Sequence, residues 1–168
     1  MNATRRTADK TLKKAAAAAA LVFLASGCGG GGTPTVPEAQ PAEETQASIG
    51  AHTVHFSAQS TDQLPMDVAR AYNIVRSKNR AMLTVSIIDD AATQSVTGEV
   101  SVKTENLTGQ LKNVIVREIR EPGETEAIYY IGETPVANQE TLIFTITVQP
   151  DGVDTPSTVR FRRQFYTD

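Results

Sequence analysis

Apolar and polar residues alternate with a period of two through most of the chain after Ile49. In "MLTVSII" the apolar Leu83, Val85 and Ile87 fall on one side, and Thr84 and Ser86 fall on the other. Similar segments, rich in β-branched and aromatic residues, are "HTVHFSA", "EVSVKT", "LKNVIVREI", "AIYYIG", "TLIFTITV" and "TVRFRRQFY". This pattern is typical of half-buried β-strands, so we expect about seven of them.

Turn signals separate these segments. "EPGET" contains a Pro-Gly pair that suits the centre of a type II turn, and "NLTGQ" and "QPDG" mark two further breaks. Seven short strands with turns between them predict an all-β fold, namely a single antiparallel β-sandwich with an immunoglobulin-like outline. A small β-barrel is the alternative.

One segment, "LPMDVARAY", departs from the period of two. Pro65 comes early, Asp67 lies in the first turn, and Leu64, Val68 and Tyr72 recur at a spacing of four. These features predict a short amphipathic helix between the first two strands. A helix of about two turns is not stable alone, so we expect it to cover an open end or an edge of the sandwich.

The first 28 residues have the layout of an export signal, with a basic leader, an apolar run from Ala15 to Ala25, and small residues. The apolar run is shorter than the roughly 20 residues of a membrane-spanning helix. The last residues, "LASGC", resemble a bacterial lipobox, and Cys28 is the only cysteine. This resemblance implies cleavage before Cys28 and acylation of its side chain, and Gly29 in the next position implies the outer membrane, facing the periplasm. A plain secretory signal and a soluble periplasmic protein are the alternative.

Residues 29–48, "GGGGTPTVPEAQPAEETQAS", hold four glycines, three prolines and three glutamates and have little to bury, so we expect a disordered tether. The predicted organisation is a signal peptide (1–27), the lipidated cysteine with its linker (28–48), and a β-sandwich domain (49–168). Without the first 28 residues, eleven Lys and Arg face eighteen Asp and Glu, a net charge of about −7. Such a balance is unfavourable for binding nucleic acid.

Candidate catalytic and metal-binding chemistry is sparse. The chain has no Gly-x-Ser-x-Gly motif, and His52 and His55, three residues apart on a strand, point to opposite faces. Asp89 and Asp90 flank a turn without the alternating oxygen ligands of a calcium loop. We therefore expect no enzymatic activity, no metal and no cofactor.

The basic residues are the remaining candidates for a site. "RSKNR" places three cations within five residues, directly before an apolar strand. Tyr129 and Tyr130 are neighbours on a strand, so one is expected in the core and the other at the surface. The candidate binding residues are Arg76, Lys78, Arg80, Arg120, Arg163 and Tyr130. The alternative is that the cations pair with carboxylates across strands, since such surface pairs are common and contribute little.

Three phrases are similar to a known family: "ARAYNIVRSKNRAMLTVSI", "REIREPGETEAIYYIGETPVANQETLIFTITVQPDG" and "RFRRQFYTD". They resemble domain of unknown function family 4426, small exported proteins of gammaproteobacteria, over nearly all of Ile49 to Asp168. The resemblance implies an extracytoplasmic β-domain with no established activity and no catalytic residues to transfer. Family members more often carry a simple cleavable signal, so the lipobox and the tether are departures from the family.

We therefore expect a non-enzymatic envelope lipoprotein that binds another envelope component, a protein. The alternative is a small-ligand module that captures an anion at Arg76, Lys78 and Arg80.

Overall fold

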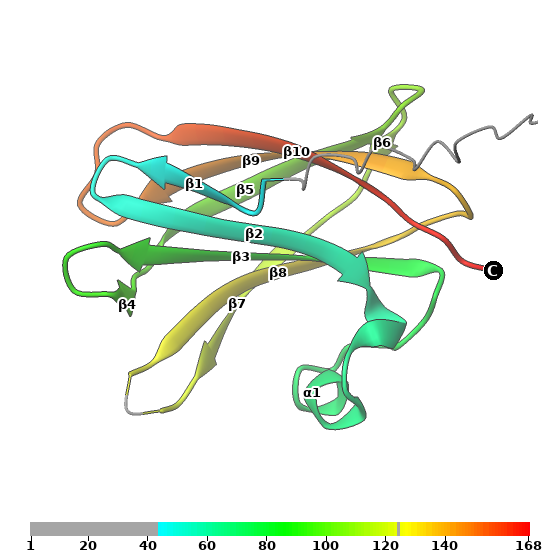
Figure 1. Cartoon of the computed structure of the whole chain (residues 1–168), viewed down its shortest axis with the longest axis horizontal. Helices are drawn as coiled ribbons and strands as arrows, with labels where there is room; N and C mark the ends of the chain where they lie inside the picture. Colours follow the sequence, from blue (N-terminus) through cyan, green and yellow to red (C-terminus); the bar gives the residue numbers. More distant parts are fainter. Residues whose placement is uncertain (1–43, 124) are drawn as a thin grey trace, which may run out of the picture. The chain divides into compact units, whose positions relative to one another are not determined.

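The alternating segments form two antiparallel β-sheets that pack face to face (Figure 1). The computed structural model describes residues 44–123 and 125–168, so the signal peptide, Cys28 and the linker up to residue 43 lie outside the described residues. Sheet A contains β1 (Gln46–Ile49), β2 (His52–Ser60), β3 (Arg80–Asp89), β4 (Gln94–Ser95), β7 (Val116–Glu121) and β8 (Ala127–Pro135). Sheet B contains β5 (Gly98–Asn106), β6 (Leu111–Lys112), β9 (Thr141–Pro150) and β10 (Ser157–Gln164).

The strand order confirms an immunoglobulin-like sandwich. Sheet A runs β1-β2-β3-β8-β7, with β4 paired to β3, and sheet B runs β10-β9-β5-β6. Without β1, β4 and β6, this order corresponds to the A-B-E-D and G-F-C sheets of an immunoglobulin constant domain. The described residues thus form two separate sheets rather than a barrel.

Three segments differ from the expectation from sequence. "LKNVIVREI" is two strands in different sheets, because the chain crosses from β6 in sheet B to β7 in sheet A. Strands β1 and β4 were not predicted, since their four and two residues show no apolar alternation. Because β1 begins at Gln46, the sandwich starts three residues before the expected boundary at Ile49, and Ala47 already packs against the core.

The core lies between the two sheets. Strand β9 contributes four side chains with no exposed surface: Leu142, Phe144, Ile146 and Val148. The rings of Phe144 and Phe161 stack with centroids 5.0 Å apart, and Phe161 also lies 5.0 Å from Phe56 of sheet A. Burying each such side chain stabilises the folded state by roughly 1.5–3 kcal/mol. Through these ring contacts, Phe161 packs β10 against β9 within sheet B and against β2 of sheet A.

The predicted helix between the first two main strands is confirmed. A 3₁₀ turn, η1 (Thr61–Gln63), precedes α1 (Met66–Ala71). A second apolar cluster lies here, made of Leu64, Ala69, Ile74, Met82 and Ile131. Met82 and Ile131 alternate with core residues of β3 and β8, so they lie on the outward face of sheet A. The helix therefore covers part of this face, and not the open end or edge that we expected.

One end of the sandwich, which we call the α1 end, collects the long connections (right side of Figure 1). These are residues 61–79 with α1, the β5–β6 turn, the β8–β9 loop and the C-terminal residues 165–168. The Val136 N–H donates to the Asn79 carbonyl oxygen (2.9 Å), and the Phe165 N–H donates to that of Glu140 (2.9 Å). These bonds tie the connections to one another.

The opposite end, which we call the hairpin end, collects short turns (left side of Figure 1). They join β1 to β2, β3 through β4 to β5, β7 to β8, and β9 to β10. The Asp90 N–H donates to the Ala51 carbonyl oxygen (3.0 Å), and the Asp151 N–H donates to that of Thr97 (3.0 Å). The two ends therefore differ in the length of their loops.

Candidate functional site

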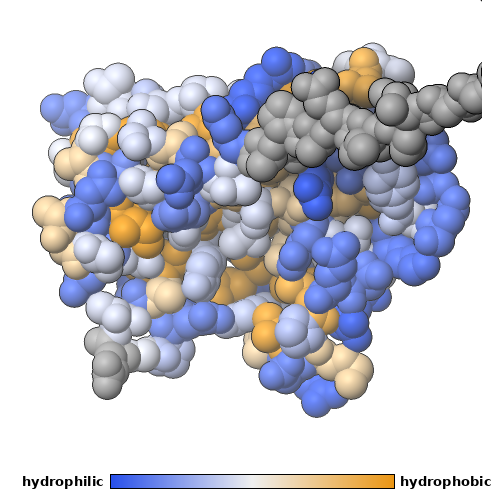
Figure 2. Space-filling view, viewed as in Figure 1, coloured by the Kyte–Doolittle hydropathy of each residue, from blue (hydrophilic) through white to orange (hydrophobic). Residues whose placement is uncertain are grey.

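An apolar groove of about 220 Å³ lies between α1 and the outward face of sheet A. Its floor comes from three adjacent strands and consists of Met82, Thr84, Ile119, Tyr129 and Ile131. Strands β3 and β8 supply apolar side chains on both faces, since Met82 neighbours the core residue Leu83 and Ile131 neighbours Tyr130. Figure 2 shows hydrophobic surface in the recess between α1 and the β7–β8 hairpin.

The wall of the groove is the α1 segment, through Leu64, Val68 and Tyr72. The Tyr72 hydroxyl donates to a carboxylate oxygen of Glu121 on β7. The Tyr72 carbonyl oxygen accepts a hydrogen bond from the Arg117 guanidinium, also on β7. These two contacts hold the C-terminal end of α1 over β7, so the groove lies between fixed walls.

The described lining of the groove is uncharged and mostly apolar. The described residues that line it include no charged side chain, and its polar groups are Gln59, Thr84 and two tyrosines. An apolar cavity of about 150 Å³ holds a benzene molecule, so this groove has room for one aromatic side chain or a short aliphatic one. The described lining residues include no nucleophile with a neighbouring base.

The cations of "RSKNR" lie at the α1 end, and none of them lines the groove. The Arg76 guanidinium donates to the Asp62 carbonyl oxygen, and the exposed Lys78 side chain points away from the core. A guanidinium nitrogen of Arg80 lies 3.7 Å from a Glu133 carboxylate oxygen. Two of the three cations are therefore already engaged within the domain.

Arg120 lies on β7 between two carboxylates, with nitrogen–oxygen distances of 2.6 Å to Glu118 and 2.9 Å to Glu126. The hydrogen bond to Glu118, its negative charge and that of Glu126 raise the pKa of Arg120. This guanidinium is exposed, so its pairs contribute little to stability.

Tyr130 lies in the core with 6% of its surface exposed. Its hydroxyl accepts a hydrogen bond from the Gly98 N–H (3.0 Å) and donates to a Glu118 carboxylate oxygen (3.2 Å). Burial raises the pKa of the Tyr130 phenol, and the Glu118 charge adds to the increase against the effect of the Gly98 bond. Tyr129, the neighbour that we did not select, is the one that reaches the groove.

Arg163 is exposed near the end of β10, where it shares the side of Phe161. Both residues line an opening of about 400 Å³ between β10 and β2, together with Gln63 and Glu44.

The six residues predicted from sequence are thus distributed over both sheets, and the groove contains none of them. Reasoning from the sequence missed the groove because its residues come from five elements, β2, the α1 segment, β3, β7 and β8, which meet only in the folded domain.

The other polar candidates have structural roles. The Asp89 carboxylate accepts the Ala91 and Ala92 N–H groups (2.9 and 2.7 Å) and so caps its own turn. Asp90 accepts the Thr53 hydroxyl (2.8 Å). Within residues 44–123 and 125–168, no three His, Cys, Asp or Glu side chains gather into a metal-binding group. The same residues include no helix that is long and apolar enough to cross a membrane.

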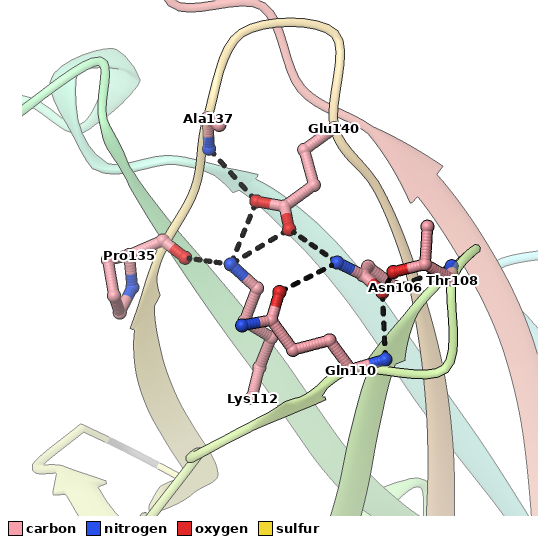
Figure 3. A network of polar contacts seen from close by, with 7 residues as sticks. All are labelled: Asn106, Thr108, Gln110, Lys112, Pro135, Ala137 and Glu140. Atoms are coloured by element: carbon pink, nitrogen blue, oxygen red, sulfur yellow. Dashed lines mark hydrogen bonds and ion pairs between the residues drawn. The ribbon is translucent and has the colours of Figure 1, made fainter.

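A polar network at the α1 end joins β6 to the β8–β9 loop (Figure 3). The Lys112 ammonium lies 2.8 Å from Glu140 Oε1, and the two side chains are 17% and 11% exposed. Burial on its own would raise the pKa of Glu140. The hydrogen bonds from Lys112, the Ala137 N–H (2.9 Å) and the Asn106 amide (3.2 Å) outweigh it, so the pKa is lowered. The charged groups of Lys112 and Glu140 are paired with each other, so we assign the network a role in stabilising the fold.

The comparisons with known proteins agree with this fold. The model of the family described as Domain of unknown function (DUF4426) matches residues 46–168, which begin with the first residue of β1 and include both sheets. The crystal structure of a DUF4426 family protein from Pseudomonas aeruginosa matches with a TM-score of 0.63 and 28% sequence identity. The match covers 75% of this chain and 96% of that chain. The comparison with curated proteins gave no match. The resemblance noted in the sequence is confirmed, and the chain belongs to the DUF4426 family.

Proposed function

We propose that this protein is a non-enzymatic binding module of the bacterial envelope, anchored through an acylated Cys28. Its task is to hold an apolar side chain of a protein partner in the groove between α1 and sheet A. The observation that carries this proposal is the groove itself, about 220 Å³ in volume, with an uncharged lining and walls fixed by Tyr72. The signal-peptide layout and "LASGC" support the anchor.

A protein partner suits the groove better than a free small ligand. Interface hot spots are apolar or aromatic side chains that enter a pocket surrounded by polar groups. Here Arg117 and Glu121, which hold Tyr72 in place, form a polar border beside the apolar floor. Tyrosine and methionine, which are enriched at protein interfaces, both contribute to the lining through Tyr129 and Met82.

Anion capture, the alternative suggested by the sequence, has less support. Arg80 lies against Glu133 and Arg120 lies against Glu118 and Glu126, so an anion at either cation would compete with carboxylates already in place. The groove, in contrast, holds no group that a ligand has to displace.

Site-specific photo-crosslinking in cells tests the groove. A photoreactive residue replaces Gln59, which is half-buried at the groove, in the full-length chain. A second substitution, Thr84→Trp, then fills the groove from its floor. The matched control is Thr145→Trp, because Thr145 also points outward from a central strand, but on sheet B.

We expect one crosslinked protein whose adduct maps to an aromatic or aliphatic residue of the partner. The adduct should be lost with Thr84→Trp and kept with Thr145→Trp. An adduct that persists when the groove is filled would reject the groove as the binding site. Absence of any adduct in cells that contain the folded protein would reject the binding function.

The anchor has its own test, fractionation of cells that express Cys28→Ala. We expect the variant to leave the membrane fraction, because several acyl chains together hold a protein durably at a bilayer. Unchanged membrane retention would reject lipidation of Cys28.

A further inference from the structure

The two ends of the sandwich expose different side chains. Among the described residues, six large hydrophobic side chains are 63–75% exposed: Met66, Val75, Leu107, Leu111, Ile115 and Tyr166. Five of them belong to the connections or adjoining strand residues of the α1 end, and Ile115 lies in the crossover that follows β6. The turns of the hairpin end contribute none of this set. Isolated exposed apolar residues are ordinary, but their gathering at one end points to an interaction surface.

Cations accompany these hydrophobic side chains. The exposed cations of the α1 end are Arg70, Arg76, Lys78, Arg162 and Arg163, against three exposed acids, Glu44, Asp67 and Asp168. The hairpin end has the opposite charge, and its exposed acids are Asp90, Glu126, Asp151 and Asp154. Its cation among the described residues is Arg120, which is already paired with Glu118 and Glu126. The domain is therefore polarised from a basic, apolar end to an acidic one.

We propose that the α1 end rests on a bilayer that carries anionic headgroups. Aliphatic and aromatic side chains such as Leu107 and Tyr166 would enter the interfacial region, and the cations around them would contact lipid phosphates. The same negative surface repels the acidic hairpin end, which then faces away from the membrane. This inference rests on the anchored location in the proposed function, although the surface can be tested without the acyl groups.

The place where the chain enters the domain agrees with this orientation. The described chain begins at Glu44, which lines the opening between β2 and β10 together with Gln63 of η1 and Arg163. This is the half of β2 that leads into α1. A tether from Cys28 therefore joins the domain on the side of its basic, apolar end.

The composition of the α1 end favours a bilayer over a protein partner. The core of a protein–protein interface is depleted of charged residues, whereas here the cations alternate with the apolar side chains along the same connections. Met66 and Val75 flank Arg70 in the α1 segment, and Lys78 follows closely. A fluid bilayer surface accepts apolar groups and cations from separate loops without requiring a complementary shape.

The chain contains no tryptophan, so a single introduced tryptophan reports on one position. Residues 40–168 suit this experiment because they include both sheets and α1, and the match to the solved family member covers 96% of that chain. The reporter is Leu107→Trp at the α1 end, and its matched control is Thr155→Trp at the hairpin end, where Thr155 is also exposed. Each variant is mixed with vesicles of phosphatidylethanolamine and phosphatidylglycerol.

We expect the tryptophan fluorescence of the Leu107→Trp variant to shift to shorter wavelengths on these vesicles. The fluorescence of the Thr155→Trp variant should stay unchanged. In the Leu107→Trp background, Lys78→Glu should weaken partitioning of the protein onto the vesicles by at least roughly fivefold. The reason is that each cation near an anionic surface strengthens binding by a factor of about five. Lys103→Glu, an equal charge change on the outward face of sheet B, should leave partitioning close to its original value.

Two results would overturn the proposal: no spectral shift of Leu107→Trp, or equal shifts at both ends. A photoreactive residue at position 107 of the full-length protein separates membrane from protein contacts in cells. Lipid adducts support the bilayer, and protein adducts assign this end to a protein partner instead. Loss of the vesicle signal leaves crosslinking at Gln59 and fractionation of Cys28→Ala unaffected, so the two proposals fail independently.

Discussion

The outward faces of the two sheets follow the same alternation but present different surfaces. On sheet A this face holds Met82, Tyr129 and Ile131, and the α1 segment packs against it. On sheet B the corresponding positions of β9 are Thr145 and Thr147, which face solvent without a covering element among the described residues. One face is thus part of a second core, and the other is a mostly polar surface on which β9 also places the half-buried Ile143.

The difference shows how the groove arises. A strand with apolar residues on both faces needs cover on both, and the cover on sheet A is a helix of only six residues. The helix is shorter than the apolar face beneath it, so Ile119 and Tyr129 remain partly uncovered and become the floor of a groove. The groove proposed as the binding surface is therefore the uncovered remainder of a hydrophobic cluster.

The largest contrast between the faces should come from truncating one isoleucine on each. Ile131 is 5% exposed on sheet A, whereas Ile143 is half-buried on sheet B. We expect Ile131→Ala to lower the free energy of unfolding by about 2–4 kcal/mol, because it removes transfer energy and leaves a cavity. Ile143→Ala should lower the free energy of unfolding by about 1 kcal/mol. Urea denaturation measures both, and equal losses would contradict the idea of a second core on sheet A.

The two lysine–glutamate pairs extend the comparison from apolar to charged groups. Lys112 and Glu140 are mostly buried, whereas Lys103 and Glu105, 3.2 Å apart on the outward face of sheet B, include a 62% exposed lysine. Lys112→Met should destabilise by about 2 kcal/mol, because it leaves the Glu140 carboxylate buried without its cation. Lys103→Met should change stability by less than about 0.5 kcal/mol. Similar losses of unfolding free energy for the two substitutions in urea would show that the Lys112–Glu140 pair does not stabilise the fold more than an exposed pair does.

The sequence predicted the framework of this molecule better than its site. Six of the seven alternating segments correspond to one strand each and the seventh, "LKNVIVREI", contains two, because period-two burial directly reflects packing between two sheets. The alternation could not show that Asn113 to Ile115 carry the chain from one sheet to the other, since strands in both sheets have the same period.

The site was harder to predict because it depends on contacts between distant residues. Strand β8 is apolar on both faces, so its sequence does not tell which tyrosine faces inward, and Tyr130 rather than Tyr129 is buried. The cations of "RSKNR" are prominent in the sequence, but Glu133, which meets Arg80, lies 53 positions further along the chain.

The pH dependence of stability should separate the buried pair from the exposed one further. The pKa of Glu140 is lower in the folded protein than in the unfolded chain, so its stabilisation is present above the unfolded value, about 4.3. This stabilisation is lost as the pH falls through the lower folded value. We expect Glu140→Gln to lower the free energy of unfolding by about 1–2 kcal/mol at neutral pH and by progressively less on acidification. Glu105→Gln, in the exposed pair, should change it by less than about 0.5 kcal/mol at neutral pH. A Glu140→Gln deficit that is constant with pH would reject the ionised pair.

The smallest effect should come from the contact that fixes the wall of the groove. Tyr72→Phe removes the hydrogen bond to Glu121 but keeps the ring, so we expect a loss of about 0.5–1.5 kcal/mol in urea unfolding. The control is Tyr166→Phe, since the exposed Tyr166 hydroxyl donates to Gln164 (2.8 Å) and its loss should have no measurable effect. Because Tyr72 holds α1 over β7, Tyr72→Phe should also reduce crosslinking from position 59, although the domain stays folded. If crosslinking is unchanged while stability falls, the hydroxyl contributes to the fold alone, and the width of the groove depends on the Arg117 contact instead.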